Sequence, residues 1–129
     1  MLYSDLFAAI GSGKLDARFS EIYGREYVGQ AKERYGRVLS EFGALYGTDR
    51  GVSFFSVPGR SELSGNHTDH NHGKVIAGSV NLDIIAAASP RSDGRINLKS
   101  EGFPEDRVDL GTFCEPDRTH FGRSDALIA

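Results

Sequence analysis

The spacing of apolar residues changes near residue 52, and this change sets the order of structure along the chain. In the first fifty residues, apolar side chains recur every three or four positions, which is the period of an amphipathic helix. Helices are expected at residues 2–10, 15–23 and 31–46. Gly47 is a plausible C-terminal stop for the last of them. The chain is therefore predicted to have an α+β fold, with N-terminal helices followed by a mixed, mainly antiparallel β-sheet.

The second half of the chain is built from short runs that are typical of strands. They lie at residues 52–57, 74–80, 82–89 and 96–100, with a shorter one at 108–110. The first run is expected to end at Pro58-Gly59. The turn-forming stretch Pro90-Arg91-Ser92-Asp93-Gly94 predicts that residues 82–100 form an antiparallel hairpin, because Asp-Gly favours positive φ.

Length and charge exclude several classes of protein. The chain has 129 residues, a formal net charge of −3 at pH 7 and a single cysteine, Cys114. This balance does not suit a protein that holds nucleic acid or anionic lipid mainly by charge. One cysteine cannot form an internal disulfide, and no apolar run approaches the length of a membrane span. A soluble, cytoplasmic protein that binds neither nucleic acid nor membrane is expected, and oligomeric state is not predicted.

Residues 58–73, PGRSELSGNHTDHNHG, are unlike the rest of the chain. Three of the four histidines fall within six residues, and almost every side chain can donate or accept a hydrogen bond. The segment lies between two runs that suit a sheet, and a polar loop held by a rigid scaffold is where binding groups usually sit. We refer to residues 58–73 as the polar segment.

Three kinds of chemistry are compatible with the polar segment. His67, Asp69, His70 and His72 could supply nitrogen and oxygen ligands to zinc, as in a metal-dependent hydrolase, although the spacing lacks a C-x-x-C or H-E-x-x-H motif. The same amides, carboxylates and imidazoles also match the donors and acceptors of a polyol. The third interpretation is a polar turn whose side chains cap its own backbone.

The polar segment resembles the galactokinase signature, whose usual form is P-G-R-x-N-L-I-G-E-H-T-D-Y-N-x-G. Ten of its sixteen positions match, namely Pro58, Gly59, Arg60, Leu63, Gly65, His67, Thr68, Asp69, Asn71 and Gly73. The resemblance covers roughly residues 50–129, and the predicted N-terminal helices resemble the extended N-terminus of some bacterial members. It implies the fold of the small-metabolite kinase superfamily known as GHMP kinases.

The resemblance also implies an activity and roles for particular residues. The parent enzyme would transfer the γ-phosphoryl group of ATP, with Mg²⁺, to O1 of galactose. Arg60 would lie near the anomeric hydroxyl and the transferring phosphate as a catalytic residue. Asn66, His67 and Asp69 would bind the sugar. Phosphoryl transfer depends mostly on positioning and charge stabilisation, so a rigid sugar clamp beside an arginine suits it.

The chain departs from the family pattern at several positions. Glu62, Ser64, Asn66 and His70 stand where the usual signature has Asn, Ile, Glu and Tyr. These changes leave open a relative that acts on another sugar or an amino sugar. The family's later phosphate loop, of the type P-x-x-x-G-L-S-S-S-A, and the catalytic aspartate beyond it do not occur in the sequence.

The chain is therefore expected to correspond to the N-terminal third of a galactokinase and to be inactive alone. Residues 1–50 would form a helical extension, and residues 51–129 the front part of the sugar-binding domain. The alternatives are a non-catalytic sugar-binding or sensing relative, and the zinc-dependent hydrolase.

Overall fold

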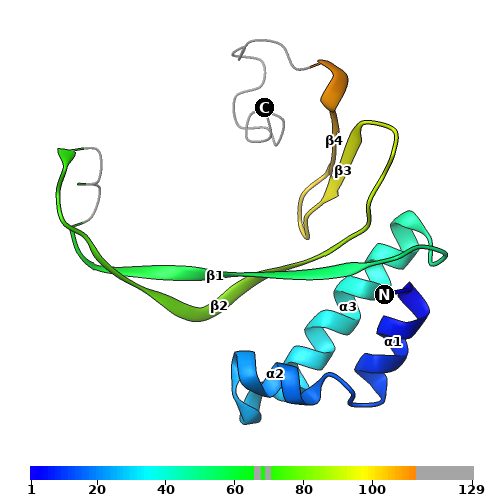
Figure 1. Cartoon of the computed structure of the whole chain (residues 1–129), viewed down its shortest axis with the longest axis horizontal. Helices are drawn as coiled ribbons and strands as arrows, with labels where there is room; N and C mark the ends of the chain where they lie inside the picture. The colour runs from blue at the N-terminus through cyan, green and yellow to red at the C-terminus, as the bar shows by residue number, and fades with distance from the viewer. Residues whose placement is uncertain (66–67, 69–70, 113–129) are drawn as a thin grey trace. The chain divides into compact units, whose positions relative to one another are not determined.

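The computed structural model of the chain describes residues 1–65, 68 and 71–112. Three α-helices come first: α1 (Tyr3–Gly11), α2 (Asp16–Tyr23) and α3 (Val28–Tyr46), with the short 3-10 helix η1 (Arg25–Tyr27) before α3 (Figure 1). The strands β1 (Ser53–Ser64), β2 (Ile76–Ala88), β3 (Arg95–Lys99) and β4 (Glu105–Asp109) follow, and then the 3-10 helix η3 (Leu110–Thr112). The chain divides into two compact units, Met1–Ser89 and Pro90–Ala129. The predicted α+β fold class is confirmed.

The helices form because their apolar residues share one face. In α3 the buried side chains are Ala31, Tyr35, Leu39 and Phe42, which recur at helical spacing. The helix ends before Gly47, as predicted, and the Gly47 N–H bonds to the Gly43 carbonyl at 3.0 Å. The three predicted helices are confirmed, with shifts of a few residues at their ends.

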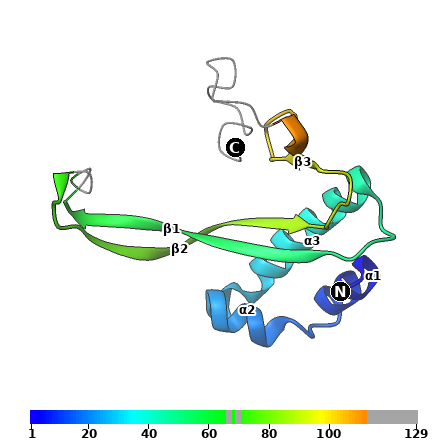
Figure 2. The ribbon, with the colours of Figure 1, turned by 45° about the horizontal axis from the view of Figure 1, so that its top comes forward.

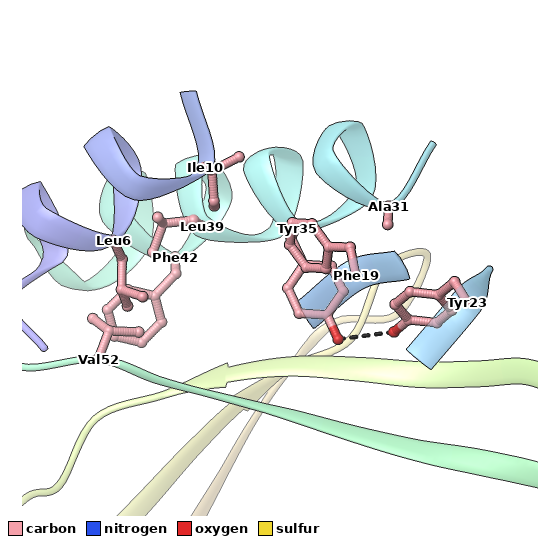
Figure 3. Close-up of a cluster of buried hydrophobic side chains, with 9 residues drawn as sticks. All are labelled: Leu6, Ile10, Phe19, Tyr23, Ala31, Tyr35, Leu39, Phe42 and Val52. Carbon is pink, nitrogen blue, oxygen red and sulfur yellow. Dashed lines mark hydrogen bonds between the residues drawn. The ribbon is translucent and has the colours of Figure 1, made fainter. Parts of the chain in front are cut away.

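The core of the first unit lies between the helices and the start of β1 (Figure 3). Its nine buried residues are Leu6, Ile10, Phe19, Tyr23, Ala31, Tyr35, Leu39, Phe42 and Val52. Tyr35 is central, with ring centroids 5.0 Å from Phe19 and 4.9 Å from Phe54 on β1. Ile85 and Ala87 on β2 also pack against this cluster. One face of the β1–β2 hairpin therefore covers the helices.

The β1–β2 hairpin extends beyond the helices that it covers (Figures 1 and 2). The two strands are antiparallel, with Ser53 opposite Ala88 and Pro58 opposite Asp83. The prediction that the first strand stops at Pro58-Gly59 is wrong, because β1 continues to Ser64. The register shifts between Pro58 and Arg60, and proline is tolerated in a strand at such an irregularity or at a sheet edge.

The prediction of a hairpin over residues 82–100 is also wrong. Residues 76–88 form one strand that pairs with β1, whereas β3 pairs with β4 in a separate two-stranded sheet. The Pro90–Gly94 stretch thus links two hairpins instead of closing one. The short strand expected at 108–110 exists as the end of β4. Both described strand pairs are antiparallel.

The second unit's described part is the β3–β4 hairpin. Its register runs from Arg95 opposite Asp109 to Lys99 opposite Glu105, and Val108 is its buried apolar residue. In the turn before β3, hydrogen bonds from the Arg91 guanidinium lower the pKa of Asp93 to about 2. This ion pair lies in an exposed turn.

Leu39→Ala should lower the free energy of unfolding of this chain by about 2–5 kcal/mol, because Leu39 is completely buried in the core and a cavity would remain. Urea unfolding followed by circular dichroism measures the change. Leu45→Ala is the matched control, since Leu45 lies on the same helix with 51% of its surface exposed. The control should change stability by less than about 0.5 kcal/mol. Equal losses in the two variants would contradict this core.

Candidate functional site

The described residues of the polar segment lie in the outer part of the β1–β2 hairpin. β1 carries its first residues as far as Ser64, and Gly65 then turns the chain with φ 87°. A Cβ atom on Gly65 would lie 2.2 Å from the Lys74 carbonyl oxygen, so only glycine allows the two sides of the loop to approach so closely. The strands thus present this segment at the far end of a two-stranded ribbon.

Thr68 organises the backbone of the described part of the loop. Its hydroxyl donates to the Gly65 carbonyl at 2.7 Å, and its own carbonyl accepts from the N–H groups of Asn71 and Gly73, at 3.1 and 2.8 Å. This is the backbone capping expected of a polar turn. At Thr68, therefore, a side chain of the polar segment serves its own loop.

Arg60 lies on β1 and is described in full. Its Nε and Nη2 atoms donate to the same Glu62 carboxylate oxygen, Oε1, at 3.1 and 3.0 Å. The Arg60 side chain is 73% exposed, whereas that of Glu62 is 24% exposed. The guanidinium is therefore open to solvent and anchored by a carboxylate that is more shielded.

A bulge in β2 lies opposite the start of this stretch. Between the pairs Pro58–Asp83 and Arg60–Ser79, the single residue Gly59 on β1 faces residues 80–82 on β2. A Cβ atom on Gly59 would lie 3.3 Å from Val80 Cγ2 and 3.4 Å from the Leu82 carbonyl oxygen. Glycine thus allows the bulge to lie close to β1. Bulges bend a strand and re-aim its side chains, and this one lies next to Arg60.

A buried carboxylate holds the hairpin on the helices directly beside the bulge. Asp83 accepts hydrogen bonds from Tyr23 at 2.5 Å, Ser56 at 2.6 Å and Arg34 at 2.8 Å. The Tyr23 and Tyr35 hydroxyls are 2.8 Å apart (Figure 3). Because Tyr23 gives its one proton to Asp83, Tyr35 donates to Tyr23. We call these five residues the Asp83 cluster.

The charges in the Asp83 cluster are fixed by its hydrogen bonds. Burial opposes ionisation of Asp83, but the bonds from Ser56, Tyr23 and Arg34, together with the Arg34 charge, outweigh it, so its pKa lies below the ordinary value of 3.8. Burial and the bond to Asp83 raise the pKa of Tyr23. The cluster therefore contains an ionised Asp83 carboxylate beside the Arg34 guanidinium, and a Tyr23 hydroxyl that stays protonated at neutral pH.

The Asp83 cluster borders a cleft of about 540 Å³ in the first unit. The polar groups that line it include Tyr27, Gln30, Arg34 and Asn81. Asp83 was not among the residues singled out from the sequence. The signal that could have found it is a lone acidic residue in the otherwise apolar run Leu82–Ala88, where a charge requires a buried partner.

Of the four residues predicted to form the site, the structure describes Arg60. Asn66, His67 and Asp69 lie outside the described residues, as does His70. His72 is exposed and has φ 58°. The described part of the chain contains no group of three His, Cys, Asp or Glu side chains that could hold a metal ion. The roles of Arg60, Asn66, His67 and Asp69 stay predictions.

Gly59 and Gly65 of the polar segment do not form a site for ATP and Mg²⁺. A phosphate site of the expected kind needs a glycine-rich loop that opens a helix with free N–H groups. Gly59 lies within a strand, and Gly65 follows that strand and begins the hairpin loop. Neither glycine precedes a helix that could cradle phosphates. In the same described residues, no helix is long and apolar enough to cross a membrane.

Comparison with known proteins identifies the polar segment's relatives. Residues 40–90 match the family model described as the galactokinase galactose-binding signature. The chain is 37% identical to the galactokinase of Lactococcus lactis subsp. cremoris (strain MG1363) over 68 residues, which are 53% of this chain and 17% of the relative. It is 33% identical to the galactokinase of Candida parapsilosis over 92 residues, covering 69% of this chain and 18% of the relative.

A third relative, the galactokinase of Streptomyces coelicolor (strain ATCC BAA-471 / A3(2) / M145), is 40% identical over 76 residues, 58% of this chain and 19% of the relative. No solved structure matches the chain significantly. The predicted resemblance to galactokinase is confirmed. The chain spans about a fifth of the length of the curated relatives that it matches.

Asp83→Asn should lower the free energy of unfolding by about 1.5–3 kcal/mol, because an amide cannot replace a buried carboxylate that accepts three hydrogen bonds. The control is Asp93→Asn, which removes an exposed ion pair and should have little effect. Urea unfolding of each variant measures the difference.

The loss caused by Asp83→Asn should also depend on pH. Because the folded pKa of Asp83 is below the unfolded value, its stabilisation is present above the ordinary pKa of 3.8 and is lost as the pH falls through the folded pKa. The difference in free energy of unfolding between wild type and Asp83→Asn should therefore be larger at about pH 6 than at about pH 3. A constant difference would contradict an ionised Asp83.

Proposed function

We propose that this chain is the galactose-binding segment of a galactokinase, which transfers the γ-phosphoryl group of ATP to O1 of galactose. The observation that carries the proposal is the match of residues 40–90 to the galactokinase galactose-binding signature. The matched stretch contains the end of α3, all of β1 and β2, and the whole polar segment. Relatives named galactokinase from bacteria and a yeast support the same function.

In this proposal Arg60 stabilises charge as the phosphoryl group moves, and Asn66, His67 and Asp69 hold the sugar hydroxyls. The exposure of the Arg60 guanidinium supports its role, because a group that contacts substrate must be reachable from solvent. A carboxylate such as Asp69 can accept hydrogen bonds from two neighbouring hydroxyls. The paired strands β1 and β2, which the loop connects, would keep these side chains oriented. Orientation of the reacting groups is the main requirement of phosphoryl transfer.

The remaining parts of the activity would come from elsewhere in a longer parent protein. ATP and Mg²⁺ would bind to a GHMP-type phosphate loop in that parent, and the segment alone would not catalyse the reaction. Residues 1–50 would be a helical extension, and residues 51–129 the front part of the sugar-binding domain. We place the parent in the cytoplasm, where a kinase finds its ATP.

Calorimetric titration of the 129-residue chain tests whether the segment holds sugar by itself. Galactose should release heat with one site per chain, and glucose should bind at least about tenfold more weakly, because one misplaced hydroxyl leaves polar groups unpaired. Galactosamine in a third titration examines the effect of Asn66 in place of the usual Glu. No galactose heat from a chain shown to be folded would count against the proposal that this segment suffices for binding.

Asp69→Ala in the full-length parent tests the site assignment. Loss of a charged hydrogen-bonding partner should weaken galactose binding by about tenfold or more, with a matching fall in kcat/KM. His72→Ala is a control on the same loop, because His72 is exposed and has no role in the proposed clamp. Unchanged sugar affinity and turnover in Asp69→Ala would refute the assignment.

A further inference from the structure

We propose that Glu62 is a specificity-determining residue, which pairs with Arg60 so that the site favours an uncharged sugar over a phosphorylated one. The inference rests on the proposed function, because it takes Arg60 as part of the sugar site. It concerns a position where the galactokinase signature usually has Asn, so it is a property of this chain.

The backbone of β1 brings the two side chains together. Arg60, Ser61 and Glu62 form a regular paired stretch between two register shifts, one before Arg60 and one after Glu62. Side chains two residues apart on a strand point to the same face. Arg60 and Glu62 are therefore neighbours by construction, and the guanidinium bonds to Glu62 Oε1 through both Nε and Nη2.

The opposite strand leaves Glu62 as the group that holds Arg60. The cross-strand partners of Arg60 and Glu62 are Ser79 and Ala77, whose side chains are short and uncharged. Within the described part of the chain, Glu62 is the side chain to which the Arg60 guanidinium is hydrogen-bonded. The position of the Glu62 carboxylate thus determines where the guanidinium lies.

The two side chains of the pair differ in their exposure to solvent. Glu62 is the more shielded partner and Arg60 the more exposed one. Nε and Nη2 face the carboxylate, whereas Nη1 makes no hydrogen bond to any residue that the structure describes. The pair consequently presents an arginine donor to a ligand while it carries no net charge.

A neutral pair discriminates between ligands by their charge. A sugar hydroxyl can accept a hydrogen bond from Arg60 with little effect of the nearby carboxylate. A phosphate group is attracted by the guanidinium and repelled by the carboxylate a few ångströms away, so part of the attraction cancels. The more exposed guanidinium keeps the rest for the moving phosphoryl group. The unphosphorylated substrate of the proposed reaction is then favoured over its phosphorylated product.

The test follows inorganic phosphate binding at Arg60 by NMR, in a ¹⁵N-labelled sample of the full 129-residue chain at low ionic strength. The Arg60 Nε–H resonance is recorded for wild type and Glu62→Gln, and Arg60→Gln confirms its assignment. Glu62→Gln should bind phosphate at Arg60 about twofold to fivefold more tightly, the range expected for an exposed ion pair. This gain should shrink at high salt because exposed charges are screened.

Glu105→Gln provides a closely matched control. Arg107 Nη2 donates to Glu105 Oε2 at 3.0 Å, also across two residues of one strand, and the two side chains are 75% and 32% exposed. This variant makes the same change in net charge but should leave phosphate affinity at Arg60 unaltered. Equal affinities in wild type and Glu62→Gln, or an equal gain in Glu105→Gln, would overturn the proposal.

Two further measurements keep the result unambiguous. If Glu62→Gln loses the dispersed spectrum of a folded chain, Glu62→Asn is titrated in its place, with the same expected gain. Galactose is then titrated into each sample, and the preference for galactose over phosphate should fall by about twofold to fivefold when Glu62 is replaced. Failure of wild type to bind galactose contradicts the proposal that this segment suffices for sugar binding, whereas an unchanged phosphate affinity at Arg60 contradicts the role of Glu62.

Discussion

The first unit depends on one buried carboxylate that joins its helices to its hairpin. Asp83 lies on β2, and its hydrogen-bond donors come from α2, α3 and β1, through Tyr23, Arg34 and Ser56. An ionised group with 5% of its side chain exposed is stable there only because every donor is in place. Apolar packing brings the helices and strands together, whereas these directional bonds fix which residues of the two layers meet.

The same contact connects the helices to Arg60 along the hairpin. Asp83 pairs with Pro58 across the hairpin, the β2 bulge follows, and regular pairing resumes at Arg60. Gly59 lies close against the bulge, where an added Cβ atom would be 3.3 Å from Val80 Cγ2. The position of Arg60 on the strand therefore depends on a bulge that the Asp83 cluster holds at its inner end. Under the proposed function, the N-terminal helices would help to orient an arginine of the sugar site.

Local patterns predicted the helices and the resemblance to galactokinases, whereas pairing between distant residues could not be predicted. The stripe that includes Tyr35 and Leu39 repeats every turn, and the polar segment carries its signature in consecutive residues. Pro58-Gly59 resembles a strand end locally, and only the bulge in β2 lets β1 continue. The turn at Asp93-Gly94 favoured the wrong strand partner for the same reason. Asp83 acquires its partners from residues up to 60 positions away.

Burial distinguishes the uses of two arginine–carboxylate pairs: Arg34–Asp83, which joins α3 to the hairpin, and Arg60–Glu62, which lies within β1. In the Arg34–Asp83 pair the carboxylate is nearly inaccessible and its hydrogen bonds hold separate elements together, so removing a partner costs folding free energy. In the Arg60–Glu62 pair both groups come from one strand, and the arginine is largely exposed. Breaking that pair should barely change stability. What it changes is the charge that an approaching ligand meets, which is why the Arg60–Glu62 pair is suited to selectivity and the Arg34–Asp83 pair to architecture.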